Sequence, residues 1–431
     1  MKPHFIYTET FGCSANQNNT EIMKGILRQA GFDTVIKTDI ADIIILNTCI
    51  VKGPTEKKIE RRISDLLKLN KPVIVAGCMP EVRAEKLKKI KNIYLLGTHH
   101  YKDILNLIYD IVNKKYRAEK YLSYKDEIKL CMNKIRQNKI IGITQISEGC
   151  LGSCNYCITR LAKGKLFSYP MEKIIENIKK DIKEGCKEIW ITSQDNAAYG
   201  TERGKYELTK LLKEILKIEG KFFVRIGMMN PNNVLPILDE LIEIYKNEKI
   251  YKFLHIPLQS GSDNILEKMN RLYSVKDFFY IVNKFRKEIP EITIATDIIL
   301  AYPGEGRKDF VKTLDVIKKI QPDVVNFSKY WAMKGTPAEK EKQIDVKIAI
   351  KRAKEFSKLY VEILQKKNKK WLGWEGKVLV DEFKNNNFIA RNTSYKPIVL
   401  KTKRRDLLGK FINVKIVNTS VNYLVGEILD R

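Results

Sequence analysis

Three closely spaced cysteines constrain this chain more than any other feature of its sequence. The stretch EGCLGSCNYC places Cys150, Cys154 and Cys157 in a C-x3-C-x2-C arrangement. Three thiolates on a four-iron, four-sulfur cubane leave the fourth iron open to a further ligand. A structural zinc site would need a fourth protein ligand, and none of the four histidines lies near the motif in sequence. A ferredoxin cluster would need a fourth cysteine, so a [4Fe-4S] cluster with one open iron is favoured.

Composition limits the class of protein. The chain has 431 residues with 44% apolar content, which predicts two or three domains. The sequence has neither a signal-peptide pattern nor an uninterrupted run of about 18 apolar residues, so we expect an intracellular, cytoplasmic protein with no membrane partner. In that compartment thiols stay reduced, and clustered cysteines indicate metal ligands or reactive groups.

The net charge indicates a polyanionic partner. Lys and Arg total 79 against 51 acidic residues, which gives a net charge of +28. Each phosphate that a basic side chain neutralises releases condensed counterions, so such a balance favours nucleic acid. The alternative is a lysine-rich chain whose helices have solvated charged faces.

The first domain, residues 1–115, alternates short apolar runs with helical patterns, which predicts an open parallel α/β sheet. Cys13 follows the first predicted strand, Cys49 ends the second and Cys78 ends the third. Because ligands of open α/β sheets sit outside the carboxyl ends of the strands, the three thiols are expected to converge on one crevice. The alternative is that they are buried core residues, a common use of reduced cysteine.

The central domain, residues 140–337, shows six strand and helix units. Six units fall short of the eight that close a full barrel, so we expect a partial, laterally open barrel. Polar side chains gather after or within its predicted strands, namely Ser193, Gln194, Asp195, Asn230, Gln259, Ser260 and Asp297.

Three further segments complete the predicted organisation. Residues 116–139 are charged and weakly patterned and are interpreted as a linker, and residues 338–370 as a helical connector. Residues 371–431 contain short strands broken by Gly and Asn, which predicts a small antiparallel β-barrel. This segment has eleven Lys or Arg and six acidic residues, together with Phe383, Phe388 and Tyr395. Interleaved basic and aromatic residues are typical of an RNA-binding surface, whereas the alternative is an ordinary solvated barrel.

These motifs resemble those of a known family. The C-x3-C-x2-C motif with Tyr156 before its last cysteine is similar to that of the radical S-adenosylmethionine superfamily. Over essentially the whole chain, the arrangement resembles the methylthiotransferase family within it. The matching stretches are TFGCSAN, NTC, AGCMPE, EGCLGSCNYC, PLQSGS, TDII and GTPA.

The resemblance implies a fold, cofactors and roles. It implies that the terminal barrel is TRAM-like, and that Cys13, Cys49 and Cys78 hold a second [4Fe-4S] cluster that carries the added sulfur. S-adenosylmethionine would bind the open iron of the first cluster and yield a 5′-deoxyadenosyl radical. It would contact the five residues Tyr156, Gln194, Asp195, Gln259 and Asp297.

The resemblance also implies a substrate. It points to the archaeal and eukaryotic branch, which adds a methylthio group to carbon 2 of N6-threonylcarbamoyladenosine at position 37 of tRNA, with an electron donor as a further partner. Other branches act on isopentenyladenosine in tRNA or on a ribosomal-protein aspartate. A different class, a non-catalytic Fe-S sensor that binds RNA, would explain the clusters and the basic barrel but not the polar groups at the strand ends.

Overall fold

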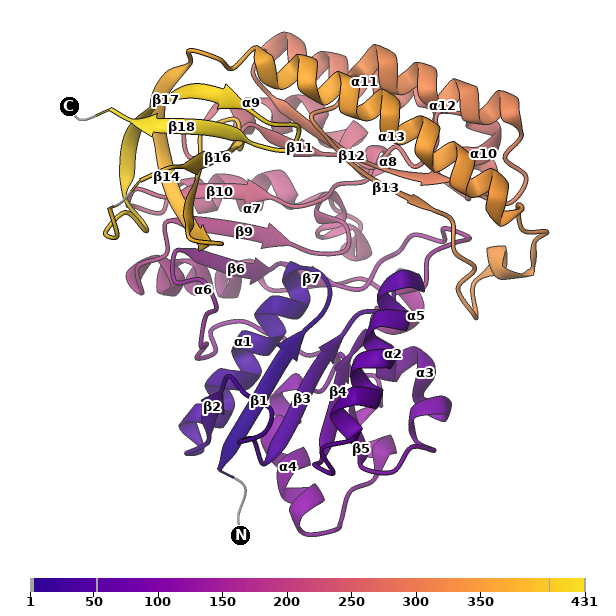
Figure 1. The fold of residues 1–431 in the computed structure, drawn as a ribbon, viewed down its shortest axis with the longest axis vertical. Coiled ribbons are helices and arrows are strands. Elements are labelled where there is room, and N and C mark those ends of the chain that lie inside the picture. The colour runs from indigo at the N-terminus through magenta and orange to yellow at the C-terminus, as the bar shows by residue number, and fades with distance from the viewer. Residues whose placement is uncertain (1–3, 52, 403, 430–431) are drawn as a thin grey trace.

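The computed structural model describes residues 4–51, 53–402 and 404–429. Figure 1 shows an N-terminal sheet at the bottom, a larger curved sheet above it, and a small barrel at the upper left. The long helix α13 (Val346–Lys369) runs across the top of the molecule and ends beside the small barrel. No helix in the described ranges is long and apolar enough to cross a membrane.

The N-terminal sheet is open and fully parallel, as predicted. Its strands pair in the order β2-β1-β3-β4-β5. The bounds are β1 (Phe5–Thr10), β2 (Asp33–Val35), β3 (Ile43–Thr48), β4 (Val73–Gly77) and β5 (Ile93–Leu96), with helices α1 (Ser14–Gln29), α2 (Gly53–Leu67), α3 (Cys78–Leu87), η1 (Tyr101–Asp103) and α4 (Ile104–Val112). Every residue of β3 and β4 is buried because helices cover both faces of the sheet. The edge strand β2 was not predicted from the sequence, because three residues are too few to show an alternation of apolar and polar side chains.

The central domain is the expected partial barrel. Its parallel strands are β6 (Ile141–Gln145), β9 (Glu188–Thr192), β10 (Phe223–Ile226), β11 (Phe253–His255), β12 (Thr293–Leu300) and β13 (Val324–Lys329). They form two three-stranded sheets, β6-β9-β10 and β11-β12-β13, joined by a parallel bridge between Val224 and Ile250. In the described part of the chain, β6 and β13 are the two end strands, so the barrel is open at one side.

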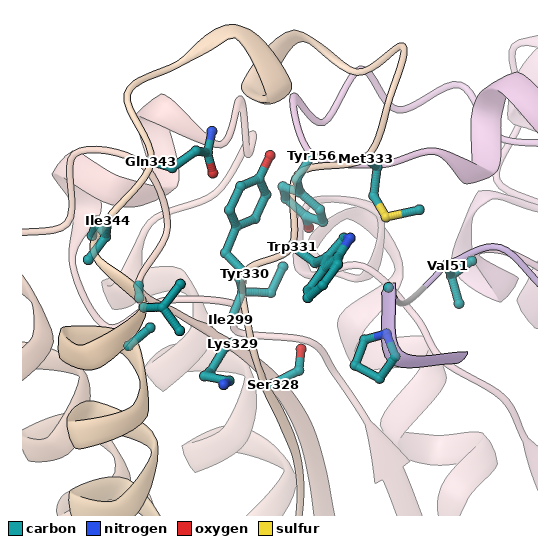
Figure 2. Close-up of a pocket in the computed structure, with 15 residues that line it drawn as sticks. Val51, Tyr156, Ile299, Ser328, Lys329, Tyr330, Trp331, Met333, Gln343 and Ile344 are labelled. Atoms are coloured by element: carbon teal, nitrogen blue, oxygen red, sulfur yellow. The ribbon is translucent and has the colours of Figure 1, made fainter. Parts of the chain in front are cut away.

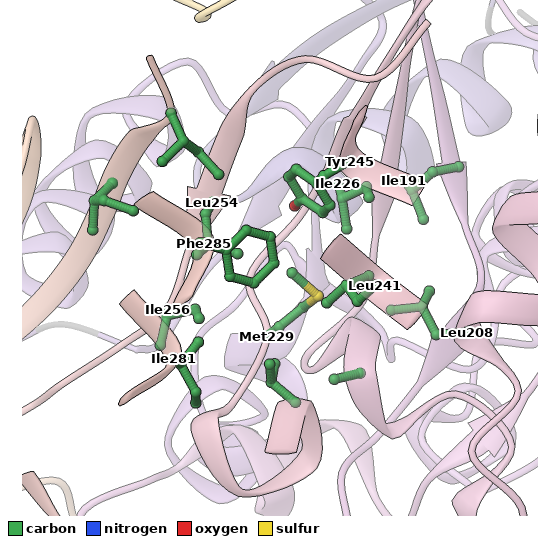
Figure 3. Packing of buried hydrophobic residues seen from close by; sticks show 14 of the residues in the cluster. Ile191, Leu208, Ile226, Met229, Leu241, Tyr245, Leu254, Ile256, Ile281 and Phe285 are labelled. Atoms are coloured by element: carbon green, nitrogen blue, oxygen red, sulfur yellow. The ribbon is translucent and has the colours of Figure 1, made fainter. Parts of the chain in front are cut away.

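Helices cover the outside of this barrel. They are α6 (Met171–Lys183), α7 (Leu208–Leu216), α8 (Pro231–Val234), α9 (Leu238–Lys246), α10 (Asp263–Lys268), α11 (Val275–Glu288) and α12 (Arg307–Ile320), with short turns η3 (Asn196–Ala198), η4 (Thr201–Arg203), η5 (Leu235–Ile237) and η6 (Pro337–Lys340). Figure 3 shows how Leu241 and Tyr245 of α9 and Phe285 of α11 meet strand residues such as Ile226 and Leu254. This packing fixes the strands, and therefore the loops at their carboxyl ends.

The segment 116–139, interpreted above as a linker, packs closely against the N-terminal domain. It contains η2 (Ala118–Tyr121), where the Tyr121 carbonyl accepts a hydrogen bond from the Gly97 amide at 2.8 Å. Further along, the Ile135 amide donates to the carbonyl of Glu21 in α1 at 3.0 Å. Lys129 is fully buried. The segment thus holds the N-terminal sheet against the central domain.

The C-terminal barrel is closed, with strands in the order β14-β15-β16-β18-β17. The bounds are β14 (Glu375–Lys384), β15 (Asn387–Arg391), β16 (Pro397–Leu400), β17 (Phe411–Thr419) and β18 (Leu424–Ile428). The pairs are antiparallel as expected, except that β16 pairs with β18 in parallel. Closure through this pair leaves the barrel without a free edge.

One interpretation of this barrel was wrong. Tyr395 is only 8% exposed, and its hydroxyl donates to Glu188 Oε1 in the central domain at 3.0 Å. Phe388 is buried inside the small barrel, while Phe383 is 45% exposed. Two of the three aromatic residues therefore stabilise the fold and its docking and are not available to stack on RNA bases.

A buried carboxylate joins the barrel, α13 and the central domain. Asp323 lies 2.7 Å from Lys396 Nζ of the barrel and 2.7 Å from Lys367 Nζ of α13, and it accepts from the Ile294 amide at 3.0 Å. Burial opposes the charge of Asp323, yet the two lysines keep its pKa below the ordinary value.

Replacement of this carboxylate should therefore be costly. Asp323→Ala leaves the buried Lys396 without its carboxylate and the half-buried Lys367 with only the Gln321 carbonyl, and we expect a loss of about 3 kcal/mol in the free energy of unfolding. Thermal unfolding followed by calorimetry measures the effect. Asp315→Ala is the matched control, because Asp315 pairs with Lys318 on an exposed surface, and it should change stability by less than about 0.5 kcal/mol. Equal effects of the two variants would contradict the structural role of Asp323.

Candidate functional site

The three N-terminal cysteines lie at one edge of the N-terminal sheet. Cys13 precedes α1 directly after β1, Cys49 follows β3, and Cys78 begins α3 directly after β4. Because β1, β3 and β4 are neighbours in a parallel sheet, their carboxyl ends bring the three residues together, as the sequence predicted.

Two glycines allow these strand ends to approach closely. Gly12 has a φ of +123°, and a side-chain carbon there would lie 2.9 Å from the Cβ of Cys49. Gly77 has a φ of +96°, and a side-chain carbon would lie 2.5 Å from the Thr48 carbonyl. Both conformations are strained for any other residue. The residues that immediately precede Cys13 and Cys78 are therefore required to be glycine.

Burial dominates the electrostatics of these thiols. It raises the pKa of Cys49, and it raises the pKa of Cys78 to about 12 although Lys163 acts in the opposite direction. Cys13 is exposed. Lys163 is itself buried and lies 2.7 Å from Glu148. The N-terminal thiols thus face a cation that belongs to the central domain.

The second set of cysteines lies on one loop of the central domain. Cys150, Cys154 and Cys157 occupy the loop between β7 (Ser147–Glu148) and α5 (Thr159–Lys163), and β7 pairs with β8 (Phe167–Ser168). The Gly152 amide donates to Cys150 Sγ at 3.2 Å. Burial raises the pKa of Cys150 to about 12 and also raises that of Cys157.

A polar cavity adjoins this loop. Its volume is about 220 Å³, and it is lined by Cys150, Cys154, Asp195, Asn230 and Arg271. Asp195 is buried and accepts hydrogen bonds from the Asn230 side chain at 2.8 Å and from Asn233 at 2.7 Å. Burial raises the pKa of Asp195, against the effect of these hydrogen bonds.

The other predicted polar residues are distributed over three strand ends. Gln194 follows β9, and its buried Oε1 has no hydrogen-bond partner among the described residues. Gln259 has a φ of +66°. Asp297 in β12 lies 3.1 Å from His255 Nε2 and accepts from the Asn326 side chain at 2.9 Å. A buried side-chain oxygen without a partner, as at Gln194, is a site at which a bound ligand can donate.

Tyr156, within the cysteine loop, lines a second pocket of about 250 Å³ (Figure 2). Ile299 of β12 and Tyr330, which follows β13, form one wall, and Val51 of the N-terminal domain lies across from them. The ring of Tyr156 also meets that of Tyr302 edge to face at 6.3 Å. The walls are largely aromatic and aliphatic, which suits a flat heterocyclic ring.

Hydrogen bonds between domains bring the two cysteine sets to the same side of the molecule. The Ser14 hydroxyl, one residue after Cys13, lies 2.8 Å from the Thr192 hydroxyl at the end of β9. The side chain of Gln145 at the end of β6 donates to Asn19 of α1 at 2.7 Å. The carboxyl ends of the N-terminal strands therefore face those of β6 and β9.

Three charged residues of this site were not predicted from the sequence. Glu148 and Lys163 flank the cysteine motif directly, and their place beside it was the only available signal. Burial would raise the pKa of Glu148, but Lys129 and Lys163 lower it to about 2. Arg271 donates to Cys154 Sγ at 3.0 Å from a loop more than a hundred residues further along the chain, and no local pattern marks it.

Comparison with protein families gives two matches. The family described as "Uncharacterized protein family UPF0004" matches residues 5–97, which form the N-terminal sheet. The radical SAM superfamily matches residues 144–317, which include the C-x3-C-x2-C loop. Residues 144–317 therefore form a radical SAM domain, a class of domain that uses S-adenosylmethionine and a [4Fe-4S] cluster.

Similar proteins define the family more closely. A Pyrococcus horikoshii protein named "Probable threonylcarbamoyladenosine tRNA methylthiotransferase" is 41% identical over 98% of this chain and 99% of its own length. A Methanocaldococcus jannaschii protein of the same name is 42% identical over 98% and 97%. A Danio rerio threonylcarbamoyladenosine tRNA methylthiotransferase is 33% identical over 99% of this chain and 78% of its own. The chain belongs to this family of radical SAM methylthiotransferases.

Solved structures share the fold. The radical S-adenosylmethionine methyltransferase TsrM from Kitasatospora setae superposes with a TM-score of 0.58 at 12% identity, over 78% of this chain and 77% of TsrM. The cobalamin-dependent radical enzyme OxsB gives a TM-score of 0.53 at 12% identity, over 84% of this chain and 57% of OxsB. At this level of identity the likeness concerns the fold alone.

The donor sets fit iron–sulfur ligation. Each set offers three thiols and no local fourth ligand, which suits a cubane with one open iron. Within the described ranges, no three His, Cys, Asp or Glu side chains converge as a single metal ion requires. The thiolates of a cubane each bind a different iron.

Thiol reactivity checks the geometry of the N-terminal set. In the metal-free protein at pH 8, iodoacetamide should modify Cys13 well before Cys49 and Cys78, because the thiolate is the nucleophile and burial keeps Cys78 protonated. Peptide mass spectrometry over a time course measures each rate. Unfolding in urea is the control and should equalise the rates. Modification of Cys78 as fast as that of Cys13 in the folded protein would contradict the arrangement described.

Proposed function

We propose that this enzyme adds a methylthio group to carbon 2 of N6-threonylcarbamoyladenosine at position 37 of tRNA. The observation that carries the proposal is the arrangement of two three-thiol sets, in different domains, at strand ends that face each other. The names of relatives that are 41% and 42% identical to this chain over nearly its full length support the choice of substrate.

Each cysteine set is assigned one [4Fe-4S] cluster. Cys150, Cys154 and Cys157 would hold the cluster that reacts with S-adenosylmethionine, and Cys13, Cys49 and Cys78 a second one. When bound, the first cluster supplies the electron that cleaves S-adenosylmethionine reductively, and the second supplies the sulfur. Two open irons, one for each task, account for the absence of a fourth cysteine in either set.

Polar residues of the barrel would bind and orient S-adenosylmethionine. The cavity beside Cys150 and Cys154 presents Asp195, whose position is fixed by Asn230 and Asn233. Gln194, Gln259 and Asp297 supply further hydrogen-bonding groups at neighbouring strand ends. The pocket lined by Tyr156 would take the adenine ring, and its apolar walls exclude water from the reaction.

Two basic surfaces would bind tRNA. The TRAM-like barrel exposes basic residues, among them Lys377, Lys384, Lys401 and Arg405. The second surface lies on α2, where Lys57, Lys58 and Arg61 are exposed and form no ion pair within the described residues.

The α2 surface also has aromatic partners close to the cysteines. Lys58 Nζ lies 5.4 Å from the ring centre of Phe11, two residues before Cys13, and Lys57 Nζ lies 4.8 Å from that of Trp331. The acidic residues of this groove are already paired, Glu9 with Arg62 and Asp65 with Lys68. A basic groove with aromatic rings beside the thiols suits the loop of a tRNA.

The alternatives have less support. Isopentenyladenosine in tRNA or a ribosomal-protein aspartate would serve as substrates for the same chemistry, but the similar proteins named above carry neither name. A non-catalytic Fe-S sensor gives no reason for the buried Gln194 Oε1, which lacks a hydrogen-bond partner among the described residues, or for the cavity beside Cys150. We place the reaction in the cytoplasm, with an electron donor as a further partner.

Paired cysteine variants test the proposal. After anaerobic reconstitution, Cys154→Ala should lose both 5′-deoxyadenosine formation and the methylthio product, because a ligand of the first cluster is removed. Cys49→Ala should still form 5′-deoxyadenosine but transfer no methylthio group to tRNA. Iron should fall from about eight to about four per chain in each variant. Iron analysis, chromatography and nucleoside mass spectrometry measure the three quantities.

The control for these variants is Cys186→Ala. Cys186 is buried, lies just before β9 and belongs to neither cysteine set. This variant should have the iron content, 5′-deoxyadenosine formation and tRNA methylthiolation of the wild type. Full methylthiolation by Cys49→Ala would mean that Cys49 is only a buried residue at a strand end and not a cluster ligand. Methylthiolation by the wild type of isopentenyladenosine alone, when both tRNA substrates are offered, would overturn the choice of substrate.

Charge reversal tests the α2 surface. Lys57→Glu, Lys58→Glu and Arg61→Glu together should weaken tRNA binding and flatten its dependence on salt, because up to about three phosphate contacts are lost. The matched control reverses Lys308, Lys312 and Lys319 on α12, which are exposed and change the net charge equally. Filter binding across a salt series measures both. Identical affinities and slopes for the two triple variants would exclude α2 from the RNA interface.

A further inference from the structure

Arg271 makes an unusually complete set of contacts at the cysteine loop. Its Nη1 donates to Cys154 Sγ at 3.0 Å and lies 3.5 Å from the Tyr156 hydroxyl. Its Nη2 donates to Asn230 Oδ1, and its Nε donates to the Tyr273 hydroxyl at 3.1 Å. All three guanidinium nitrogens are therefore engaged, and one of them points at a cluster ligand.

Among the described residues, the charge of Arg271 has no acidic partner in direct contact. Within the described parts of the chain, no carboxylate lies at ion-pair distance from it. Arg271 is partly buried, and a cation withdrawn from water is costly unless an anion or several hydrogen-bond acceptors compensate for the lost solvent. The group that faces it is Cys154, which becomes a thiolate when it binds iron. The guanidinium is thus placed to offset negative charge on the cluster and its ligands.

The position of the guanidinium is fixed from two sides. Asn230, which accepts from Arg271, also donates to Asp195 at 2.8 Å. The ring of Tyr273 lies 4.8 Å from the guanidinium carbon, and the Tyr273 hydroxyl donates to the Pro257 carbonyl at 2.8 Å. The planar fork of arginine satisfies these contacts at once, which the single ammonium group of lysine cannot do.

We propose that Arg271 sets the reduction potential of the cluster held by Cys150, Cys154 and Cys157, through its hydrogen bond to the Cys154 sulfur. This inference rests on one part of the proposed function, namely that Cys150, Cys154 and Cys157 hold a [4Fe-4S] cluster. Reduction adds one electron and breaks no bond, so the cluster becomes more negative by one charge. A donated N–H and a nearby positive charge stabilise that reduced form and raise the potential.

The test is a redox titration of the reconstituted protein with dithionite, followed by electron paramagnetic resonance. It is done without S-adenosylmethionine, and in a Cys49→Ala background so that one cluster gives the signal. Arg271→Met should shift the midpoint to more negative potential by at least a tenfold change in the reduction equilibrium, about 59 mV for one electron. Arg271→Lys keeps the positive charge but not the planar fork of arginine. Its midpoint potential should therefore lie between those of the wild type and Arg271→Met.

Arg286→Met is the matched control. Arg286 on α11 is a half-buried arginine that donates to the Gln321 carbonyl at 3.2 Å and contacts neither cysteine set. It should leave the midpoint unchanged.

Four outcomes decide the inference. An unchanged potential in Arg271→Met with iron still at about four per chain overturns it. Loss of the cluster in Arg271→Met together with a wild-type potential in Arg271→Lys also overturns it, in favour of a structural role. An unchanged potential with a raised KM for S-adenosylmethionine overturns it as well, since Arg271 would then bind the cosubstrate. Absence of any cluster in the Cys49→Ala background, by contrast, counts against the proposed function itself.

Discussion

The contact between helix α1 and the open side of the barrel determines the rest of the site. The bond from Gln145 to Asn19 holds α1 against the end strand β6, and the bond between Ser14 and Thr192 fixes the residue next to Cys13 at the end of β9. A parallel sheet gathers its loops at one edge, and here two such edges face each other. Both cysteine sets therefore open toward one region, although they lie in different domains.

A buried set of charges reinforces this contact. Glu148, two residues before Cys150, lies between Lys163 of α5 and Lys129 of the segment 116–139. Lys129 also donates to the Thr98 carbonyl at 2.6 Å, which links the set to the loop after β5. Removal of one member would leave an uncompensated buried charge, so the set favours a single relative arrangement of the two domains. Segment 116–139, which was interpreted as a linker from the sequence, is thus part of the interface between the N-terminal and central domains.

The sequence predicted much of the fold because its signals are local. Cys13, Cys49 and Cys78 each follow an apolar run, and the carboxyl ends of parallel strands meet at one edge whatever the details of packing. Tyr395 was misjudged because an aromatic residue in a small barrel has the same local pattern whether it faces solvent or another domain. Arg271 was missed because its role depends on a contact with Cys154 that exists only after the barrel has formed. Local patterns reveal strand ends, whereas contacts across the barrel need the structure.

The two cysteine sets are expected to hold two clusters that face one common region. Electron paramagnetic resonance of the reduced protein tests this arrangement most directly, since two paramagnetic clusters that are close together interact magnetically. We expect the wild-type spectrum to differ in line shape and relaxation from the sum of the spectra of Cys49→Ala and Cys154→Ala. A wild-type spectrum equal to that sum, with iron at about eight per chain, would contradict this arrangement.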